Sequence, residues 1–125
     1  MRVLVVDDSR AARAILKAAL RACGHDEVIE AEKGLEGLVR LKRSDTIPDM
    51  VLVDWNMPEM DGLEFVKRVR SDHAFDGALL MMVTSETNPE RMVQALEAGA
   101  NEYLMKPLER EGLIEKLRIL SAVTD

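Results

Sequence analysis

Short apolar runs recur along the chain, separated by longer stretches in which apolar and polar residues are mixed. Three of these runs are continuous, which is typical of strands in a parallel sheet that is covered on both faces. The run at 27–31 alternates instead, which indicates an edge strand. The predicted strands are residues 3–6, 27–31, 50–53, 79–83 and 102–105.

Between the runs, apolar residues recur with the period of an α-helix. Ser9 and the pair Asn88-Pro89 are suited to begin the first and fourth helices. Gly24 and Gly99 are suited to end the same two helices. The predicted buried faces are Ala11, Ile15, Ala18 and Ala22; Leu35, Leu38 and Val39; Leu63, Val66 and Val69; Met92, Ala95 and Leu96; and Ile114, Leu117 and Leu120.

The order of elements is strand then helix, repeated five times. Such alternation predicts an α/β fold with a parallel sheet, right-handed crossovers and helices on both faces. The fifth helix uses nearly all of the remaining chain, and no linker or repeat interrupts the pattern. We therefore expect one domain over residues 1–125.

Composition narrows the class of protein. The chain has 125 residues, 47% of them apolar, and a formal net charge of −6. This balance favours a folded domain and argues against non-specific binding to nucleic acid or anionic lipid. The single cysteine excludes an internal disulfide. No apolar run approaches the ~20 residues of a membrane span, so we expect a cytoplasmic protein.

Polar side chains follow four of the predicted strands at the point where each strand ends. These are Asp7 and Asp8, then Asp54, then Thr84 with Ser85, and finally Lys106 before a proline. Ligands of open α/β sheets bind outside the carboxyl ends of the strands, near a topological switch point. The sequence therefore predicts that these reactive groups meet at one edge of the sheet.

The combination of groups favours phosphoryl chemistry. Three carboxylates held together repel one another, and Mg²⁺ would relieve that repulsion through oxygen ligands. A carboxylate beside such a metal can attack a phosphoryl group and form an aspartyl phosphate, here on Asp54. Asp7 and Asp8 would serve the metal, while Lys106 and Thr84 would neutralise phosphoryl oxygens.

Each of these residues, taken alone, also has a simpler interpretation. An isolated Asp-Asp pair after a strand is more often a helix cap or turn, and a lone lysine before proline is usually solvated. A phosphohydrolase of the haloacid-dehalogenase type would need D-x-D after the first strand, whereas this chain has Asp7-Asp8-Ser9. A flavin- or nucleotide-binding module would need a Gly/Ser/Thr-rich phosphate loop there.

Four motifs together carry a resemblance to a known family. They are "VDD" at 6–8, "DWNMPEMDG" at 54–62, "VTS" at 83–85 and "KP" at 106–107. With these motifs, essentially the whole chain resembles the receiver domain of two-component response regulators, most directly the single-domain chemotaxis type. The resemblance implies a flavodoxin-like, doubly wound (βα)5 fold with strand order 2-1-3-4-5. It also implies a cis peptide bond between Lys106 and Pro107.

The resemblance also implies a role for each site residue. Asp54 would be the phosphoacceptor, and Thr84 and Lys106 would bind the phosphoryl oxygens. The ligands of Mg²⁺ would be Asp8, Asp54 and the backbone carbonyl of Asn56, with Asp7 acting through water. The switch residues would be Thr84 and Tyr103: Thr84 would follow the phosphoryl group, and Tyr103 would then turn inward. Asn56 and Glu86 would tune the lifetime of the phosphorylated state.

The implied function is a phosphorylation-dependent switch. A histidine kinase would supply the phosphoryl group, and hydrolysis, with or without a phosphatase, would remove it. The domain would catalyse its own phosphorylation and dephosphorylation without turning over an external metabolite. A downstream protein would bind the surface of the fourth helix (about 89–98), fifth strand and fifth helix. The expected state is a monomer, either freestanding or part of a longer regulator.

Overall fold

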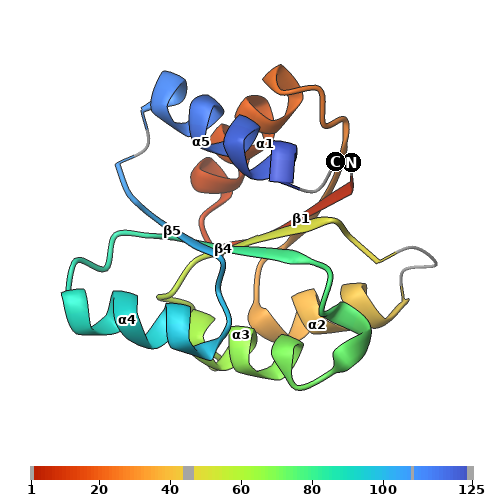
Figure 1. Ribbon diagram of the computed structural model, residues 1–125, viewed down its shortest axis with the longest axis vertical. Helices are drawn as coiled ribbons and strands as arrows, with labels where there is room; N and C mark the ends of the chain where they lie inside the picture. The colour runs from red at the N-terminus through yellow and green to blue at the C-terminus, as the bar shows by residue number, and fades with distance from the viewer. Residues whose placement is uncertain (1, 44–46, 108, 124–125) are drawn as a thin grey trace.

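The computed structural model describes residues 2–43, 47–107 and 109–123 as a single sheet with helices on both sides (Figure 1). Three strands have the predicted limits, whereas β1 begins one residue earlier and β4 ends one residue later than predicted. A short 3-10 helix that the sequence did not reveal precedes β4. The elements are β1 (Arg2–Val6), α1 (Arg10–Ala22), β2 (Glu27–Ala31), α2 (Gly34–Arg43), β3 (Met50–Val53), α3 (Gly62–Arg70), η1 (His73–Phe75), β4 (Leu79–Thr84), α4 (Pro89–Ala98), β5 (Glu102–Met105) and α5 (Arg110–Val123).

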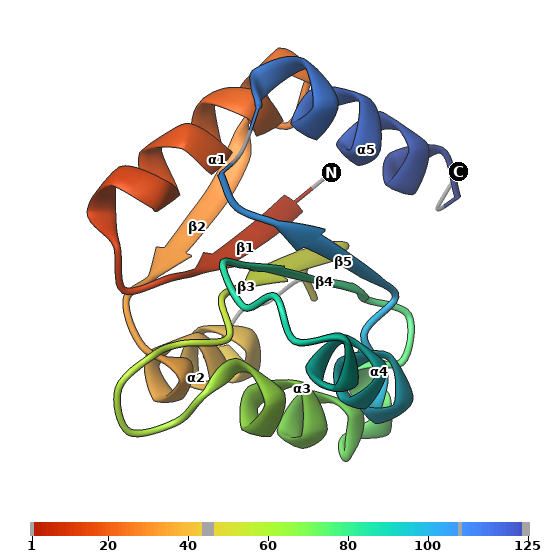
Figure 2. The same ribbon diagram turned by 90° about the vertical axis from the view of Figure 1, so that its left-hand side faces the viewer.

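The sheet is parallel throughout, and its strand order is β2-β1-β3-β4-β5. Helices α1 and α5 cover one face, and α2, α3 and α4 cover the other (Figures 1 and 2). This arrangement confirms the predicted flavodoxin-like fold and its strand order. The edge position of β2 is confirmed as well.

Each face of the sheet has its own apolar core, because successive residues of a strand point to opposite faces. Leu4 and Val6 point toward the side of α2, α3 and α4, where Phe65 is fully buried. Val3 and Val5 point toward the side of α1 and α5, where they pack with a second set of buried residues. Strands β1, β3 and β4 are thus enclosed on both sides, as their continuous apolar sequences indicate.

The local signals for helix ends are confirmed. The side chain of Ser9 accepts a hydrogen bond from the backbone of Ala12, and Asn88 caps α4 in the same way. Gly24 and Gly99 follow the ends of their helices with φ of 88° and 121°, a region that glycine adopts without strain. The peptide bond between Lys106 and Pro107 is cis.

The predicted inward face of α1 is wrong. Ala11, Ala18 and Ala22 are exposed, and the side chain of Ile15 is half exposed. The helix carries a second apolar stripe one position along the chain, and that stripe contains the larger leucines. Burial of a leucine removes more apolar surface from water than burial of an alanine, so this stripe takes the inward side. Its members are Ala12, Leu16, Ala19 and Leu20.

Two further faces are only partly confirmed. In α2, Leu38 packs against the core, but Leu35 and Val39 are exposed and Leu41 is buried. In α4, Ala95 is buried and Leu96 is exposed. The predicted faces of α3 and α5 are confirmed: Val66, Val69, Leu117 and Leu120 are buried, and Leu63 and Ile114 pack at the margins of the cores.

One arginine side chain binds the turns that precede β4 and β5. The guanidinium of Arg70, at the end of α3, donates to the backbone carbonyls of Gly99, Phe75 and Ala78 at 3.0, 2.9 and 2.8 Å. It also donates to the side chain of Asn101 at 2.8 Å, and that side chain accepts a second bond from the backbone of Leu80. The turns at this end of the sheet are thereby tied to one side chain.

Gly62 is required where α3 begins beneath the end of β3. A Cβ at this position would lie 2.8 Å from the Cα of Trp55 and would also collide with the backbone carbonyl of Asp54. Backbone atoms cannot rotate away as a side chain can. We expect Gly62→Ala to lower the free energy of unfolding by about 1–3 kcal/mol, as overpacking does elsewhere. Urea titration followed by circular dichroism measures the change.

Gly112→Ala in α5 is the matched control, because nothing lies within 4 Å of the added carbon. It should raise stability by about 0.5–1 kcal/mol through helix propensity. Equal destabilisation by both substitutions would contradict the steric argument.

Candidate functional site

The predicted site residues meet at the carboxyl edge of the sheet. Asp7 and Asp8 follow β1, and Asp54 follows the neighbouring strand β3. The connection from β1 leads to α1 on one face, whereas the connection from β3 leads to α3 on the other (Figure 2). This divergence is the topological switch point at which open α/β sheets bind ligands.

The three aspartates form a compact acidic cluster. One carboxylate oxygen from each lies within 4.8 Å of those of the other two. Asp7 and Asp54 are buried, and Asp8 is exposed. The Lys106 ammonium lies 2.9 Å from Asp7 Oδ2 and 3.6 Å from Asp54 Oδ2, so it offsets part of the repulsion. The cluster therefore keeps an excess of negative charge.

Asp54 has an environment suited to an activated carboxylate. Burial raises its pKa above the ordinary value, and the charge on Asp7 adds to the rise, while Thr84 and Lys106 oppose it. Its Oδ1 is one of two buried side-chain polar atoms without a hydrogen-bond partner among the described residues. A buried acceptor without a partner is costly, and this one is free to receive a ligand.

The acidic cluster fits a hard cation. Its donor atoms are carboxylate oxygens, which Mg²⁺ prefers, and one of its three residues, Asp54, also carries the unpartnered Oδ1. A divalent cation would offset the negative charge of the cluster that Lys106 does not neutralise. The exposed Asp8 would leave such an ion open to solvent on one side.

The end of β4 joins the site through Thr84, which is fully buried. Its hydroxyl accepts a hydrogen bond from the backbone N–H of Glu86 at 3.2 Å. The backbone carbonyl of Glu86 accepts another from the hydroxyl of Tyr103 at 2.9 Å. Glu86 therefore connects the two predicted switch residues through its main chain.

Tyr103 is already buried in this structure, with only 8% of its surface exposed, so its inward position does not require a phosphoryl group. Burial raises the pKa of its phenol, and the nearby negative charge of Glu86 raises it further. The hydroxyl is therefore protonated at neutral pH and available as a donor. The ring packs in the same core as Phe65 and Ala95.

Two contacts beside the site were not predicted. Arg91 lies over the ring of Trp55, 5.2 Å from its centroid, and 3.8 Å from a carboxylate oxygen of Glu86. The other carboxylate oxygen of Glu86 accepts from the backbone of Asn88 at 3.2 Å. The side chain of Glu86 is thus held from two sides, whereas Asn56 is exposed in the loop after β3.

Sequence reasoning also missed Arg13, a buried arginine on α1. Arginine is usually exposed, so its identity alone gives no signal of burial. The signal that was available is the pair of acidic residues at the end of the edge strand, Glu30 on β2 and Glu32 just after it, which contact Arg13. Across the described ranges, no helix is long and apolar enough to span a membrane.

Comparisons with known proteins identify the same family over most of the chain. The family profile described as "Response regulator receiver domain" matches residues 3–118. The chain is 44% identical to a chemotaxis protein CheY homolog of Campylobacter jejuni over 117 residues, which is 94% of this chain and 89% of the relative. It is 42% identical to the chemotaxis protein CheY1 of Helicobacter pylori over the full length of both.

Solved structures that resemble this chain are also response regulators. The chemotaxis response regulator CheY4 of Vibrio cholerae superposes with a TM-score of 0.86 at 35% identity, over 95% of this chain and 97% of that one. A putative two-component system response regulator/GGDEF domain protein gives a TM-score of 0.89 at 31% identity, over 99% of this chain and 50% of that one. The same architecture therefore occurs alone and within a longer protein.

Proposed function

The chain belongs to the response regulator receiver family, and we propose that it is a chemotaxis-type switch in which Asp54 accepts a phosphoryl group from a histidine kinase. The observation that supports this most is the position of Asp54. It follows β3 beside two other carboxylates, its Oδ2 lies 3.6 Å from the Lys106 ammonium, and its Oδ1 has no hydrogen-bond partner among the described residues. Receiver domains of this type signal through phosphorylation.

The proposed transfer is an in-line displacement. A carboxylate oxygen of Asp54 attacks phosphorus, the bond between phosphorus and the donor imidazole breaks, and the imidazole leaves with the bonding electrons. Lys106, now between Asp7 and Asp54, would turn to a phosphoryl oxygen, and Thr84 would donate its hydroxyl to another. Both residues would then stabilise charge that develops in the transition state.

Mg²⁺ completes the proposed site. Asp8, Asp54 and the backbone carbonyl of Asn56 would hold the ion directly, and Asp7 would hold it through water. When bound, the ion supplies positive charge that offsets the cluster and the incoming phosphoryl group. Two observations support the fit: the donor atoms are carboxylate oxygens, and Oδ1 of Asp54 is buried without a hydrogen-bond partner among the described residues.

The proposed output begins at Thr84. If Thr84 moves toward the phosphoryl group to donate its hydroxyl, the Glu86 N–H that is bonded to it can move as well, and so can the Glu86 carbonyl that holds Tyr103. The readout surface would be α4, β5 and α5, where β5 forms an edge of the sheet between the two helices (Figure 2). Large apolar side chains are exposed on these elements: Val93, Leu96, Met105 and Ile119. A downstream protein would bind there, in a freestanding switch or in a longer regulator.

The first test concerns the acceptor. Asp54→Asn removes the nucleophile and preserves the side-chain volume, so it should abolish the covalent phosphoryl adduct. Incubation with acetyl phosphate and Mg²⁺, followed by intact-mass measurement, detects the adduct. Asp26→Asn, at an exposed position outside the site, is the matched control and should keep the wild-type yield. An adduct of wild-type yield on the Asp54 variant would exclude this residue as acceptor.

The lifetime of the phosphorylated state should depend on Asn56 and Glu86. Both are polar and flank the proposed acceptor, and the carboxylate of Glu86 is held by Arg91 and Asn88. We expect the double substitution Asn56→Leu and Glu86→Leu to slow hydrolysis by about tenfold or more, because an ordered water is lost. Decay of the adduct after donor removal measures this rate.

Glu90→Leu makes the same acid-to-leucine change at an exposed position of α4 and should leave the decay unchanged. Equal half-lives of the double variant and the wild type would refute the role of this pair.

Activation should reach the output surface. Beryllofluoride, a phosphoryl mimic, is expected to shift the NMR resonances of Tyr103 and of residues 89–98 as well as those of the loops around the site. Asp54→Asn is the control, because it lacks the carboxylate that holds the mimic. Shifts restricted to the surroundings of Asp54, Thr84 and Lys106 would rule out this output surface.

A further inference from the structure

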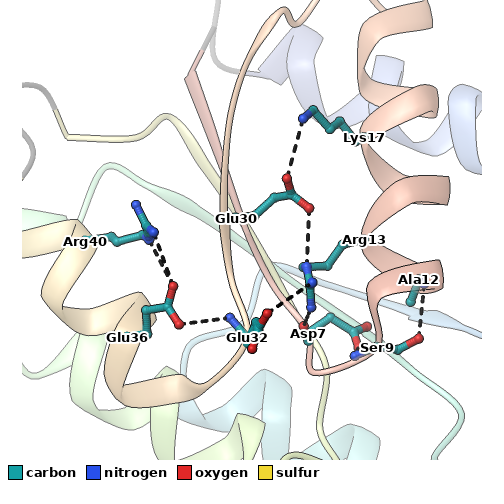
Figure 3. A network of polar contacts seen from close by, with 9 residues as sticks. All are labelled: Asp7, Ser9, Ala12, Arg13, Lys17, Glu30, Glu32, Glu36 and Arg40. Carbon is teal, nitrogen blue, oxygen red and sulfur yellow. Dashed lines mark hydrogen bonds and ion pairs between the residues drawn. The ribbon is translucent and has the colours of Figure 1, made fainter.

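Arg13 is a buried cation beside the acidic site that none of the roles above explains. It lies in the first turns of α1, and its side chain is only 8% exposed. Burial of a guanidinium group is costly unless its donors are paired. All three nitrogens of this group have partners: Nη1, Nε and Nη2 contact Asp7, Glu30 and Glu32 respectively (Figure 3).

The shortest of these contacts is to the backbone. Nη1 donates to the carbonyl oxygen of Asp7 at 2.7 Å, in a buried position. That carbonyl and the N–H of Asp8 belong to one planar peptide unit. A bond that fixes the carbonyl therefore also fixes the plane from which the Asp8 side chain departs.

The other polar atoms of Asp7 are held as well. Its N–H donates to Ala31 at 3.1 Å, its Oδ1 accepts from the backbone of Ser9 at 2.9 Å, and its Oδ2 accepts from Lys106 at 2.9 Å. None of these three bonds acts on the peptide that leads to Asp8. Only the bond from Arg13 does so, because it is made to the Asp7 carbonyl. Asp8 itself is exposed, so its direction depends on that peptide.

Two glutamates, one on the edge strand β2 and one just after it, hold the guanidinium from the far side. Glu30 lies 3.3 Å from Nε and Glu32 lies 3.6 Å from Nη2. Glu30 belongs to β2 and Glu32 follows its last residue, and the pair contacts two nitrogens of one planar group. Glu30 also pairs with Lys17 at 3.5 Å, which is the next basic residue along the same side of α1 (Figure 3).

We propose that Arg13 is a positioning residue that orients the Asp7–Asp8 peptide and thereby sets the affinity of the acidic cluster for Mg²⁺ without touching the ion. This inference rests on the proposed function, because it assumes that Asp8 is a ligand. It adds a residue of α1 and, through it, the edge strand β2 to the machinery of the site.

The charge of Arg13 makes the sign of the effect diagnostic. Removal of a cation near a divalent metal should strengthen metal binding by Coulomb's law alone. Loss of a positioning contact should weaken it, since outer contacts of metal ligands commonly contribute 10- to 100-fold in affinity. The two explanations therefore predict opposite changes for the same substitution.

The experiment compares Arg13→Gln with Lys17→Gln in the full chain by calorimetric titration with Mg²⁺. Both substitutions remove one positive charge that pairs with Glu30, but only the first removes the bond to Asp7. We expect Arg13→Gln to weaken binding by about tenfold or more. Lys17→Gln should stay within about twofold, as expected for a partly solvated and screened charge.

Unfolding in urea with and without Mg²⁺ gives a second readout. A merely structural role for Arg13 would lower stability equally in both conditions. A positioning role reduces the gain that Mg²⁺ provides, because that gain depends on its affinity for the folded state. If Arg13→Gln does not fold, Arg13→Lys decides the question, because a lysine cannot hold the carbonyl and both glutamates at once; an affinity loss of about threefold or more is expected.

Asp8→Ala separates this inference from the proposed site. If Asp8→Ala weakens Mg²⁺ binding and the tested Arg13 variant does not, the inference is overturned and the proposed site stands. If Asp8→Ala has no effect, both are overturned.

Discussion

Mutual repulsion of three carboxylates is the constraint on which the rest of the site depends. Asp7, Asp8 and Asp54 are brought together because β1 and β3 are neighbours whose carboxyl ends meet at one edge. Two of the three side chains are buried, so water does little to screen their charges. Lys106, from the far edge of the sheet, reaches two of them and supplies partial compensation. The fold thus holds a charge imbalance in a fixed place, and chemistry that brings positive charge to that place is favoured.

The strands and helix ends were accessible from the sequence because local physics determines them. Continuous apolar runs predicted β1, β3 and β4, and residues with distinct backbone preferences predicted the ends of α1 and α4. The convergence of Asp7, Asp54 and Lys106 followed from the rule that parallel strands end at one edge. These features need no knowledge of side-chain packing.

The buried face of α1 and the role of Arg13 were not accessible in the same way. Two apolar stripes compete on that helix, and period alone does not rank them; the larger leucines, Leu16 and Leu20, decide the outcome. Arg13 is buried because two separate segments supply its acceptors: Asp7 after β1, and the pair Glu30 and Glu32, which lie 17 or more residues away. The main-chain links of Glu86 to Thr84 and Tyr103 were equally hidden, since a sequence shows side chains and not backbone contacts.

The bonds made by Arg70 give the two ends of the sheet different freedom. At the amino end, one guanidinium holds three carbonyls and a side-chain amide, so a change in any of these turns disturbs the others. At the carboxyl end, the groups that meet are side chains on separate loops. Over evolutionary time we expect the turns at the amino end to vary slowly and together, while the exposed helix surfaces outside the acidic site vary independently of them. A lineage could in this way acquire new signalling partners while it keeps the same stable fold.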